Sequence, residues 1–248
     1  MPHYFVERAM HVGDEVVLRG GDARHVLRVL RLARGDWLKL SDGQGKTFRA
    51  EIIATATTHL TARITEECAS RQGTPPPLLA IAIIKHDRTE AIIQKAVELG
   101  IQRIVPFSSA RTIPTFAAGI KDAKQVRWQR IAEEAAKQSG LPFQPKVDPP
   151  STFEALMAIA STTELSLLFW ESERTQPISQ LASALKSAAQ KLVIIGPEGG
   201  FAPEEIARAQ AHGVRTVSLG PQILRVETAA VAALAVIQFL SGNFEIET

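Results

Sequence analysis

Hydrophobic and polar positions follow two different patterns along the 248 residues of this chain. Up to residue 73, the apolar residues fall in short β-branched or aliphatic runs, which predict strands at 3–6, 15–18, 37–40, 47–54 and 60–64. Asp42-Gly43-Gln44-Gly45 is typical of a hairpin turn between two of these strands. One helix is expected among them, from an N-cap at Asp22 to Leu32. This region therefore predicts a small β barrel or sandwich.

From residue 78 onward, apolar strands alternate with helical patterns. We expect strands at 79–84, 101–106, 165–170, 192–195 and 216–219. We expect helices up to Leu99, over 121–139 and over 226–240. The alternation indicates an α/β domain with a mostly parallel sheet. Because the last helix is almost wholly apolar, we expect it to be buried between layers or in a subunit contact, which favours a homodimer.

A proline-rich segment separates the two patterns. Thr74-Pro75-Pro76-Pro77 contains three consecutive prolines, which disfavour both helix and central strand and stiffen the chain. We therefore expect an N-terminal β domain at 1–73, a linker at 74–77 and an α/β domain at 78–248.

Two glycine-proline loops follow predicted strands of the α/β domain. The first is Ile195–Phe201 (IGPEGGF), and the second opens the stretch Leu219–Ala229 (LGPQILRVETA). Open α/β sheets bind ligands beyond the carboxyl ends of their strands, and glycine lets a ligand approach the backbone. One such loop is usually only a turn, but a second with Arg225 and Glu227 just beyond it favours a site. Neither loop contains a phosphate-binding fingerprint, so we expect a ligand with little phosphate.

Composition narrows the class of protein. Cys68 is the only cysteine and the six histidines are scattered without ligand spacing, so we expect neither a disulfide nor a metal site. No apolar run approaches the roughly 20 residues that span a bilayer, and no leader-like segment opens the chain. We therefore expect a cytoplasmic protein with no membrane partner.

Positive charge is concentrated near the N-terminus, although the net charge of the chain is only +2. The window 19–49 holds eight Lys or Arg residues against three Asp residues. Within the predicted helix, Arg24, Arg28 and Arg31 follow i, i+4, i+7 spacing on one face. Such a stripe is often only a solvated face, but the scarcity of acidic neighbours favours a surface that binds phosphates.

The chain resembles, over its full length, the bacterial 16S ribosomal RNA uracil-N3 methyltransferases of the SPOUT superfamily. The motifs that carry the resemblance keep their order and spacing: 25–28 (HVLR), 35–36 (GD), 42–45 (DGQG), 95–100 (KAVELG), 134–135 (EA), 138–139 (QS), 196–201 (GPEGGF), 219–220 (LG) and 223–229 (ILRVETA). The resemblance implies a PUA-like RNA-binding barrel followed by an α/β methyltransferase domain with a C-terminal trefoil knot, which pattern alone would not predict. The chain departs from the family at Gly140-Leu141 and at Gln222, where arginines are common.

The resemblance also implies a cofactor and a substrate. It implies S-adenosylmethionine, wrapped by the two glycine-proline loops and the loop after residues 165–170, in a homodimer. The residues expected to line the cofactor are Phe169, Trp170, Gly196, Pro197, Gly199, Gly200, Leu219, Gly220, Ile223 and Leu224. The substrate implied is 16S ribosomal RNA within the small ribosomal subunit.

Methylation of uridine N3 needs help, because this nitrogen is protonated at neutral pH. Arg225 is our candidate for stabilising charge on the uracil oxygens, and Glu198 or Glu227 for accepting the proton. Structural roles are the alternatives, since Arg225 can cap a helix and pair with Glu227. N3 lies on the Watson–Crick edge, so the base must be unpaired, and Arg88 and Arg111 are further candidates for RNA contact.

Two other functions remain open from the sequence. One is a relative in the same superfamily that methylates transfer RNA or a ribose 2′-hydroxyl. The other is a ribosome-assembly factor that binds RNA without catalysis. The N-terminal motifs disfavour the first, and the intact loops disfavour the second.

Overall fold

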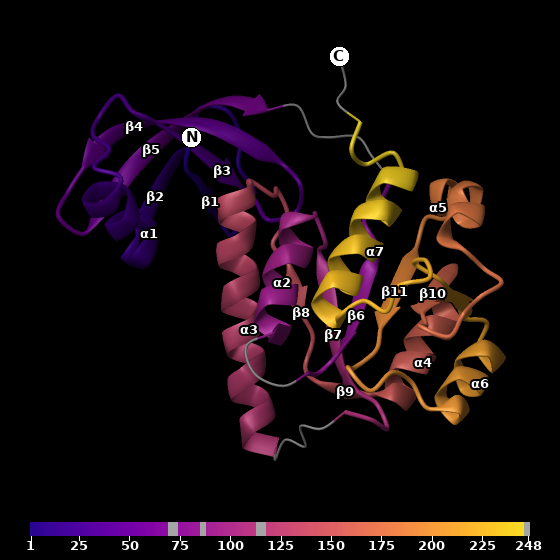
Figure 1. Ribbon diagram of the computed structural model, residues 1–248. Coiled ribbons are helices and arrows are strands. Elements are labelled where there is room, and N and C mark those ends of the chain that lie inside the picture. Colours follow the sequence, from indigo (N-terminus) through magenta and orange to yellow (C-terminus); the bar gives the residue numbers. More distant parts are fainter. Residues whose placement is uncertain (69–73, 85–87, 113–117, 246–248) are drawn as a thin grey trace. The chain divides into compact units, whose positions relative to one another are not determined.

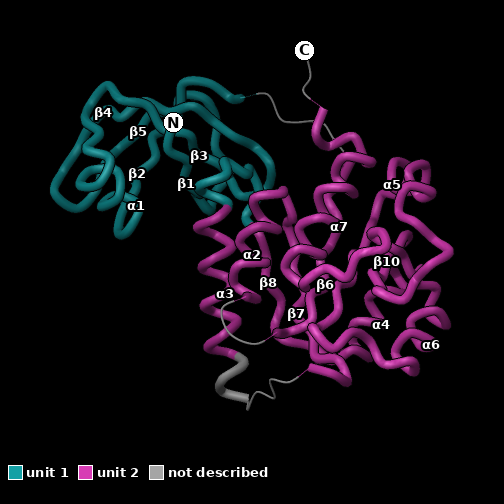
Figure 2. The backbone as a smooth tube through the Cα atoms, viewed as in Figure 1, with its two compact units in different colours: residues 1–72, 136–144 teal, residues 73–135, 145–248 magenta. Residues whose placement is uncertain are grey.

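The computed structural model describes residues 1–68, 74–84, 88–112 and 118–245. The chain forms two compact units (Figure 2). Unit 1 contains residues 1–72 and 136–144, and unit 2 contains residues 73–135 and 145–248. Unit 1 therefore combines the N-terminal region with a segment from the middle of the chain.

Unit 1 contains a curled five-stranded sheet in the order β1-β3-β4-β5-β2 (Figure 1). The β1–β3 pair is parallel, whereas β3–β4, β4–β5 and β2–β5 are antiparallel. Buried and exposed side chains alternate along β2, so Val16 and Leu18 face inward. They pack in a core with Leu38, Phe48 and Ile52. All five predicted strands are confirmed, with the bounds β1 His3–Phe5, β2 Glu15–Arg19, β3 Trp37–Ser41, β4 Thr47–Thr55 and β5 His59–Cys68.

The predicted helix from Asp22 to Leu32 is wrong in its bounds and in its form. An α-helical turn, α1 (Gly20–Arg24), continues into a π-helical turn, η1 (His25–Val29). The N-cap is Arg19 rather than Asp22, whose carboxylate instead pairs with Lys137 Nζ at 2.7 Å. The helix widens because the Leu30 N–H donates to the His25 carbonyl, five residues earlier.

Unit 2 contains a parallel sheet of seven strands in the order β12-β10-β11-β6-β7-β8, with β9 also paired to β7. Every residue of β10 and β11 is buried, as expected for central strands covered on both faces. The five strands predicted here are confirmed, although β7 begins and ends two residues later than expected and β6 and β12 each end two residues earlier. The bounds are β6 Leu78–Ala82, β7 Arg103–Ser108, β8 Lys146–Val147, β9 Ser151–Thr152, β10 Leu165–Phe169, β11 Lys191–Ile195 and β12 Arg215–Val217.

Helices cover both faces of this sheet. On one face α4 and α6 pack over a cluster that includes Phe107 and Phe201. On the other face α7 packs against α2 and β11 (Figure 1), and the Gln238 side chain of α7 donates to the Leu99 carbonyl at 2.6 Å. The helices are α2 Arg88–Glu98, α3 Ala118–Ser139, α4 Phe153–Thr162, η2 Ile178–Leu181, α5 Ala182–Ser187, α6 Pro203–Ala211 and α7 Val226–Leu240.

The last helix has the predicted bounds but is not wholly buried. Ala230, Leu234 and Ile237 are inside the unit, whereas Val231 is 37% and Phe239 68% exposed. Only one side of an apolar helix can face the sheet, so this side is not covered within the single chain, and its burial in a subunit contact stays a prediction.

The proline linker is attached to unit 2. The Thr74 hydroxyl donates to the Ser241 carbonyl at 3.0 Å, just beyond α7. Lys191, the first residue of β11, donates through Nζ to the Pro75 carbonyl at 3.3 Å. These bonds fix the start of β6 beside β11.

Candidate functional site

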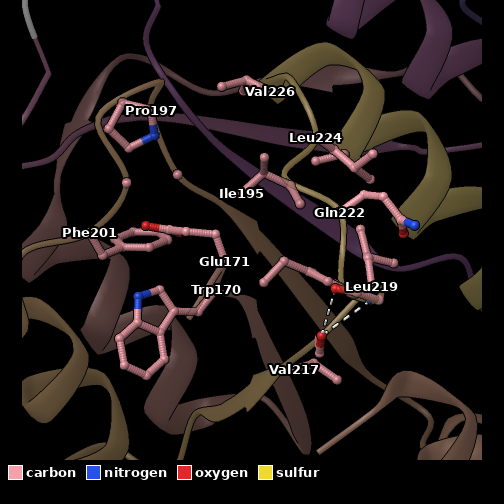
Figure 3. Close-up of a pocket in the computed structure, with 16 residues that line it drawn as sticks. Trp170, Glu171, Ile195, Pro197, Phe201, Val217, Leu219, Gln222, Leu224 and Val226 are labelled. Carbon is pink, nitrogen blue, oxygen red and sulfur yellow. Dashed lines mark hydrogen bonds between the residues drawn. The ribbon is translucent and has the colours of Figure 1, made fainter. Parts of the chain in front are cut away.

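A pocket lies at the carboxyl ends of β10, β11 and β12 in unit 2 (Figure 3). It is an open pocket of about 580 Å³, counting the solvent-filled space at its mouth. The loops after the three strands and the first turn of α7 form its walls. The lining residues are Phe169, Trp170, Glu171, Ile195, Gly196, Pro197, Gly200, Phe201, Val217, Ser218, Leu219, Gly220, Gln222, Leu224, Val226 and Ala229.

The loop after β11 needs glycine at two positions. A Cβ at Gly196 would lie 2.7 Å from the Phe201 ring, which is itself held in the core beside Phe107 and Phe153. Gly200 has a φ of +67°, and its N–H donates to the Pro197 carbonyl at 2.9 Å to close a tight turn. The backbone of this loop therefore lies bare against the pocket.

Helix α6 begins directly after this loop without a side-chain cap, because Ala202 occupies the N-cap. The buried Glu205 carboxylate accepts the Ala202 N–H at 2.9 Å, which is half of a capping box. Its other oxygen accepts the Ala110 N–H, also at 2.9 Å, from the segment after β7. One carboxylate thus fixes both the start of α6 and a loop from a distant part of the sequence.

The loop after β10 is tied to β12 by a buried carboxylate, Glu173. Its Oε2 accepts the Thr216 hydroxyl at 2.6 Å, and its Oε1 accepts the backbone N–H and hydroxyl of Thr175, both at 2.7 Å, and the Gln176 N–H. The side-chain bonds from Thr175 and Thr216 lower the pKa of Glu173 to about 2, with the Thr175 hydroxyl contributing most. Glu173 is therefore ionised in the folded protein and holds two walls of the pocket together.

Most of the predicted cofactor residues come together in the pocket. Eight of the ten line it: Phe169, Trp170, Gly196, Pro197, Gly200, Leu219, Gly220 and Leu224. Gly199 and Ile223 lie outside the lining. Ile223 is 83% exposed, and the exposed Gly199 accepts a hydrogen bond at its carbonyl from Arg111 Nη1 at 2.9 Å.

The three catalytic candidates surround the pocket without lining it. Arg225 is exposed at the N-cap of α7, between the lining residues Leu224 and Val226. Glu198 is exposed on the loop after β11. Glu227, in the first turn of α7, has one buried oxygen, Oε2, with no hydrogen-bond partner among the described residues.

Two of the candidate RNA contacts lie beside the same loop in unit 2. Arg88 Nη1 is 3.7 Å from Glu198 Oε1, and Arg111 contacts Gly199 as described above. Both arginines are exposed. They therefore place positive charge next to the glycine-rich loop.

The other three candidates lie in unit 1, where the expected helical stripe is wrong in form. Arg24 ends α1 and Arg28 belongs to the π-helical turn. Arg31 lies beyond the helix with a left-handed backbone, φ 56°. All three are exposed and form no ion pair within the described part of the chain. Arg24, Arg28 and Arg31 are therefore exposed cations that no ion pair neutralises in the described residues, and they are called the basic surface below.

The sequence did not single out Glu171 or Glu173. Both follow β10 within four residues, so their place after a predicted strand was the available signal. Each is distinguished by a contact with a residue remote in the sequence. Glu173 contacts Thr216, 43 positions away, and Glu171 lies against Gly200, 29 positions away. Nothing in a linear pattern pairs these positions.

No group of three or more His, Cys, Asp or Glu residues in the described ranges could hold a metal ion. No described helix is long and apolar enough to cross a membrane.

The fold and the pocket define a class: a parallel α/β domain with a small-molecule site at its strand ends, in a chain that also contains a small β unit. The RNA methyltransferase domain model matches residues 74–238, and the RNA methyltransferase PUA domain model matches residues 18–65. The chain therefore belongs to the RNA methyltransferase family that these models describe.

Individual relatives agree with this assignment. Ribosomal RNA small subunit methyltransferase E of Synechocystis is 36% identical over 229 residues, covering 91% of this chain and 73% of that protein. The protein with the same name from Bacillus subtilis is 28% identical over 247 residues, covering 96% of both chains. The crystal structure of the Neisseria gonorrhoeae protein of that name, bound to S-adenosyl methionine, is 30% identical with a TM-score of 0.88, covering 99% of this chain and all of that one.

Proposed function

We propose that this protein transfers a methyl group from S-adenosylmethionine to N3 of a specific uridine in 16S ribosomal RNA, within the small ribosomal subunit. Family membership supports methyl transfer to RNA, and the relatives' names support ribosomal RNA of the small subunit. The observation that carries the proposal is the pocket at the strand ends, whose described lining contains no basic side chain. Such a lining suits a nucleoside ligand without phosphate.

S-adenosylmethionine fits this pocket by its chemistry. It combines an adenine, a ribose and an amino acid but carries no phosphate, so backbone amides, carbonyls and apolar side chains meet most of its needs. Gly196, Leu219, Gly220 and Leu224 would hold it beside Ile195. When bound, it supplies an electrophilic methyl group on a sulfonium.

The residues beside the pocket are suited to activating a uridine. We assign Arg225 the stabilisation of negative charge on the uracil oxygens, since it is exposed next to lining residues. We assign proton acceptance at N3 to Glu198 or Glu227. The unpartnered Oε2 of Glu227 supports the second choice, because a buried carboxylate oxygen without a donor is available to accept a proton.

The exposed arginines would hold RNA around the target base. The basic surface of Arg24, Arg28 and Arg31 supports phosphate binding by unit 1, since none of the three is neutralised by an ion pair in the described residues. Arg88 and Arg111 support phosphate binding next to the glycine-rich loop. The target uridine must be unpaired for its Watson–Crick edge to react.

Three further properties belong to the same proposal. A C-terminal trefoil knot is supported by the path of the chain, which passes from the edge strand β12 back across β10 and β11 to pack α7 against α2. A homodimer is supported by the exposed apolar residues Val231 and Phe239 on α7. Ribosomal RNA as substrate supports residence in the cytoplasm.

The proposal is tested by incubating the full chain with labelled S-adenosylmethionine and either small ribosomal subunits, free 16S RNA or transfer RNA from cells that lack the enzyme. We expect label in 16S RNA. Label in transfer RNA would show that transfer RNA, not 16S RNA, is the substrate. Cofactor binding without any methyl transfer would favour a non-catalytic assembly factor. Sedimentation of the purified chain tests the dimer, which a monomer at working concentration would exclude.

A further inference from the structure

Glu171 is the single ionisable side chain among the described residues that line the pocket. The other lining residues are glycine or apolar, apart from Ser218 and Gln222. Glu171 lies two residues beyond the end of β10 and points toward the loop after β11 (Figure 3). Any charge that the lining offers to a ligand therefore comes from this carboxylate.

The backbone that carries Glu171 is fixed on both sides. The preceding residue, Trp170, donates its N–H to the Val217 carbonyl of β12 at 3.1 Å. The Glu171 carbonyl accepts a bond from Arg174 Nη1, and Glu173 joins the same loop to Thr216. A side chain on a loop held in this way is preorganised for binding.

Gly200 leaves room for the Glu171 carboxylate. A Cβ built at Gly200 would overlap with Glu171 Oε1 and would lie 3.0 Å from Cδ. The carboxylate thus occupies the space that a side chain at position 200 would fill, beside Pro197 and Phe201 (Figure 3). Within the described residues it forms no hydrogen bond or ion pair, so its acceptor capacity is open to a ligand.

We propose that the Glu171 carboxylate binds the ribose of the cofactor by accepting hydrogen bonds from its two vicinal hydroxyls. The inference rests on S-adenosylmethionine as the ligand. A carboxylate beyond the end of one parallel strand, beside the glycine loop of the next, is the arrangement with which dinucleotide-binding sheets hold a ribose hydroxyl. Two carboxylate oxygens match two adjacent hydroxyl donors.

Calorimetric titration of the full chain tests this assignment with three ligands. S-adenosylmethionine has the ribose diol, an ammonium and a sulfonium. S-adenosylhomocysteine lacks the sulfonium. 5′-Methylthioadenosine lacks the sulfonium and the amino-acid end, with its ammonium and carboxylate, but keeps the diol. We expect Glu171→Gln to weaken all three by the same factor, about tenfold, as for loss of a charged acceptor. Glu204→Gln, an exposed carboxylate on α6 outside the lining, is the matched control and should change none of them.

Other patterns overturn the assignment. Weaker binding of S-adenosylmethionine and S-adenosylhomocysteine with unchanged 5′-methylthioadenosine would place the carboxylate on the ammonium. Loss of affinity for S-adenosylmethionine alone would mean that the carboxylate contacts the sulfonium. No loss of affinity for any ligand would mean that Glu171 does not contact the cofactor. If the wild-type chain binds none of the ligands, the proposed cofactor is wrong rather than the role of Glu171.

A second variant keeps the test independent of one substitution. Gly200→Ala introduces a Cβ into the space of the carboxylate, so it should weaken the same three ligands in parallel. The double variant Glu171→Gln, Gly200→Ala should lose affinity relative to wild type. Its fold-loss should be smaller than the product of the fold-losses of the two single variants, since both substitutions act on one contact. A fold-loss equal to that product would mean that Gly200 and Glu171 affect ligand binding independently.

Discussion

Glu173 holds one wall of the pocket in place through four hydrogen bonds. Three come from Thr175 and Gln176 in its own loop after β10, and the fourth comes from the Thr216 hydroxyl of β12. The ordinary carboxyl pKa of 4.5 falls to about 2 in the folded protein. Ionised Glu173 therefore stabilises the fold fully above about pH 4.5, and this stabilisation is lost as the pH falls toward 2. The effect of removing its charge must depend on pH.

Replacement of Glu173 by glutamine should lower the free energy of unfolding at pH 7 by about 1–3 kcal/mol, since charged hydrogen bonds are lost. Near pH 2.5 the deficit should be much smaller, because Glu173 of the unfolded wild-type chain is then protonated and folding must release that proton. Chemical denaturation of both proteins at the two pH values measures this difference. An equal deficit at both would show that Glu173 acts by packing alone.

His3 gives a pH dependence of the same sign in unit 1, but in a higher pH range. Burial, assisted by nearby Lys39, lowers the pKa of His3 to about 4, and its ring bonds to the Ser41 hydroxyl at 2.7 Å. The folded protein therefore favours neutral His3, so this contribution to stability is complete above about pH 6.5 and is lost as the pH falls toward 4. His3→Gln, which removes the titrating ring, should flatten the decline in stability between pH 7 and pH 5. An unchanged slope would assign the decline to other groups.

The elements were largely predictable from the chain because their apolar periodicity is strong. Central strands such as β10 and β11 are continuous apolar runs, and α7 has the bounds that its composition indicates. The turn into η1 was not predictable. Asp22, which resembles an N-cap in the sequence, is instead paired with Lys137 from the returning segment of unit 1. Such a contact has no trace in local sequence.

The loop after β11 makes the clearest prediction at the scale of an element. Gly196→Ala would press a Cβ into the Phe201 ring and shift either the loop or the core, so S-adenosylmethionine should bind at least tenfold more weakly. Gly199→Ala in the same loop is the control, since its Cβ would meet Arg111 Cβ at 3.3 Å on the exposed side. Calorimetric titration compares them. Equal losses would mean that Gly199 also contributes to the pocket.

Just beyond the end of η1, Arg31 is expected to lower the stability of the protein while contributing to RNA binding. Arg31 has a left-handed backbone, which costs a non-glycine residue about 1 kcal/mol. Arg31→Gly should therefore raise thermal stability slightly while weakening RNA binding and its salt dependence. Arg28→Gln, at a helical position, should weaken RNA binding without the gain in stability. Unchanged RNA affinity in both variants would mean that this basic surface is only solvated and does not bind RNA.

At the scale of the whole molecule, the sequence indicated two regions and a pocket at strand ends, but could not indicate which distant residues meet. Unit 1 takes in residues 136–144 from the middle of the chain. Glu205 contacts both Ala202 and Ala110, and Glu171 contacts Gly200. The residues that give the pocket its charge and rigidity are therefore known only once the chain is folded, because their partners are remote in sequence.

The proposed product is a uridine of small-subunit ribosomal RNA that carries a methyl group at N3. The most direct measurement is mass spectrometry of nucleosides from 16S RNA after reaction of the full chain with S-adenosylmethionine and small subunits from cells that lack the enzyme. We expect a single new 3-methyluridine, which should be absent when Arg225 is replaced by alanine. A 2′-O-methylated nucleoside, or methyl groups only in transfer RNA, would contradict this expectation.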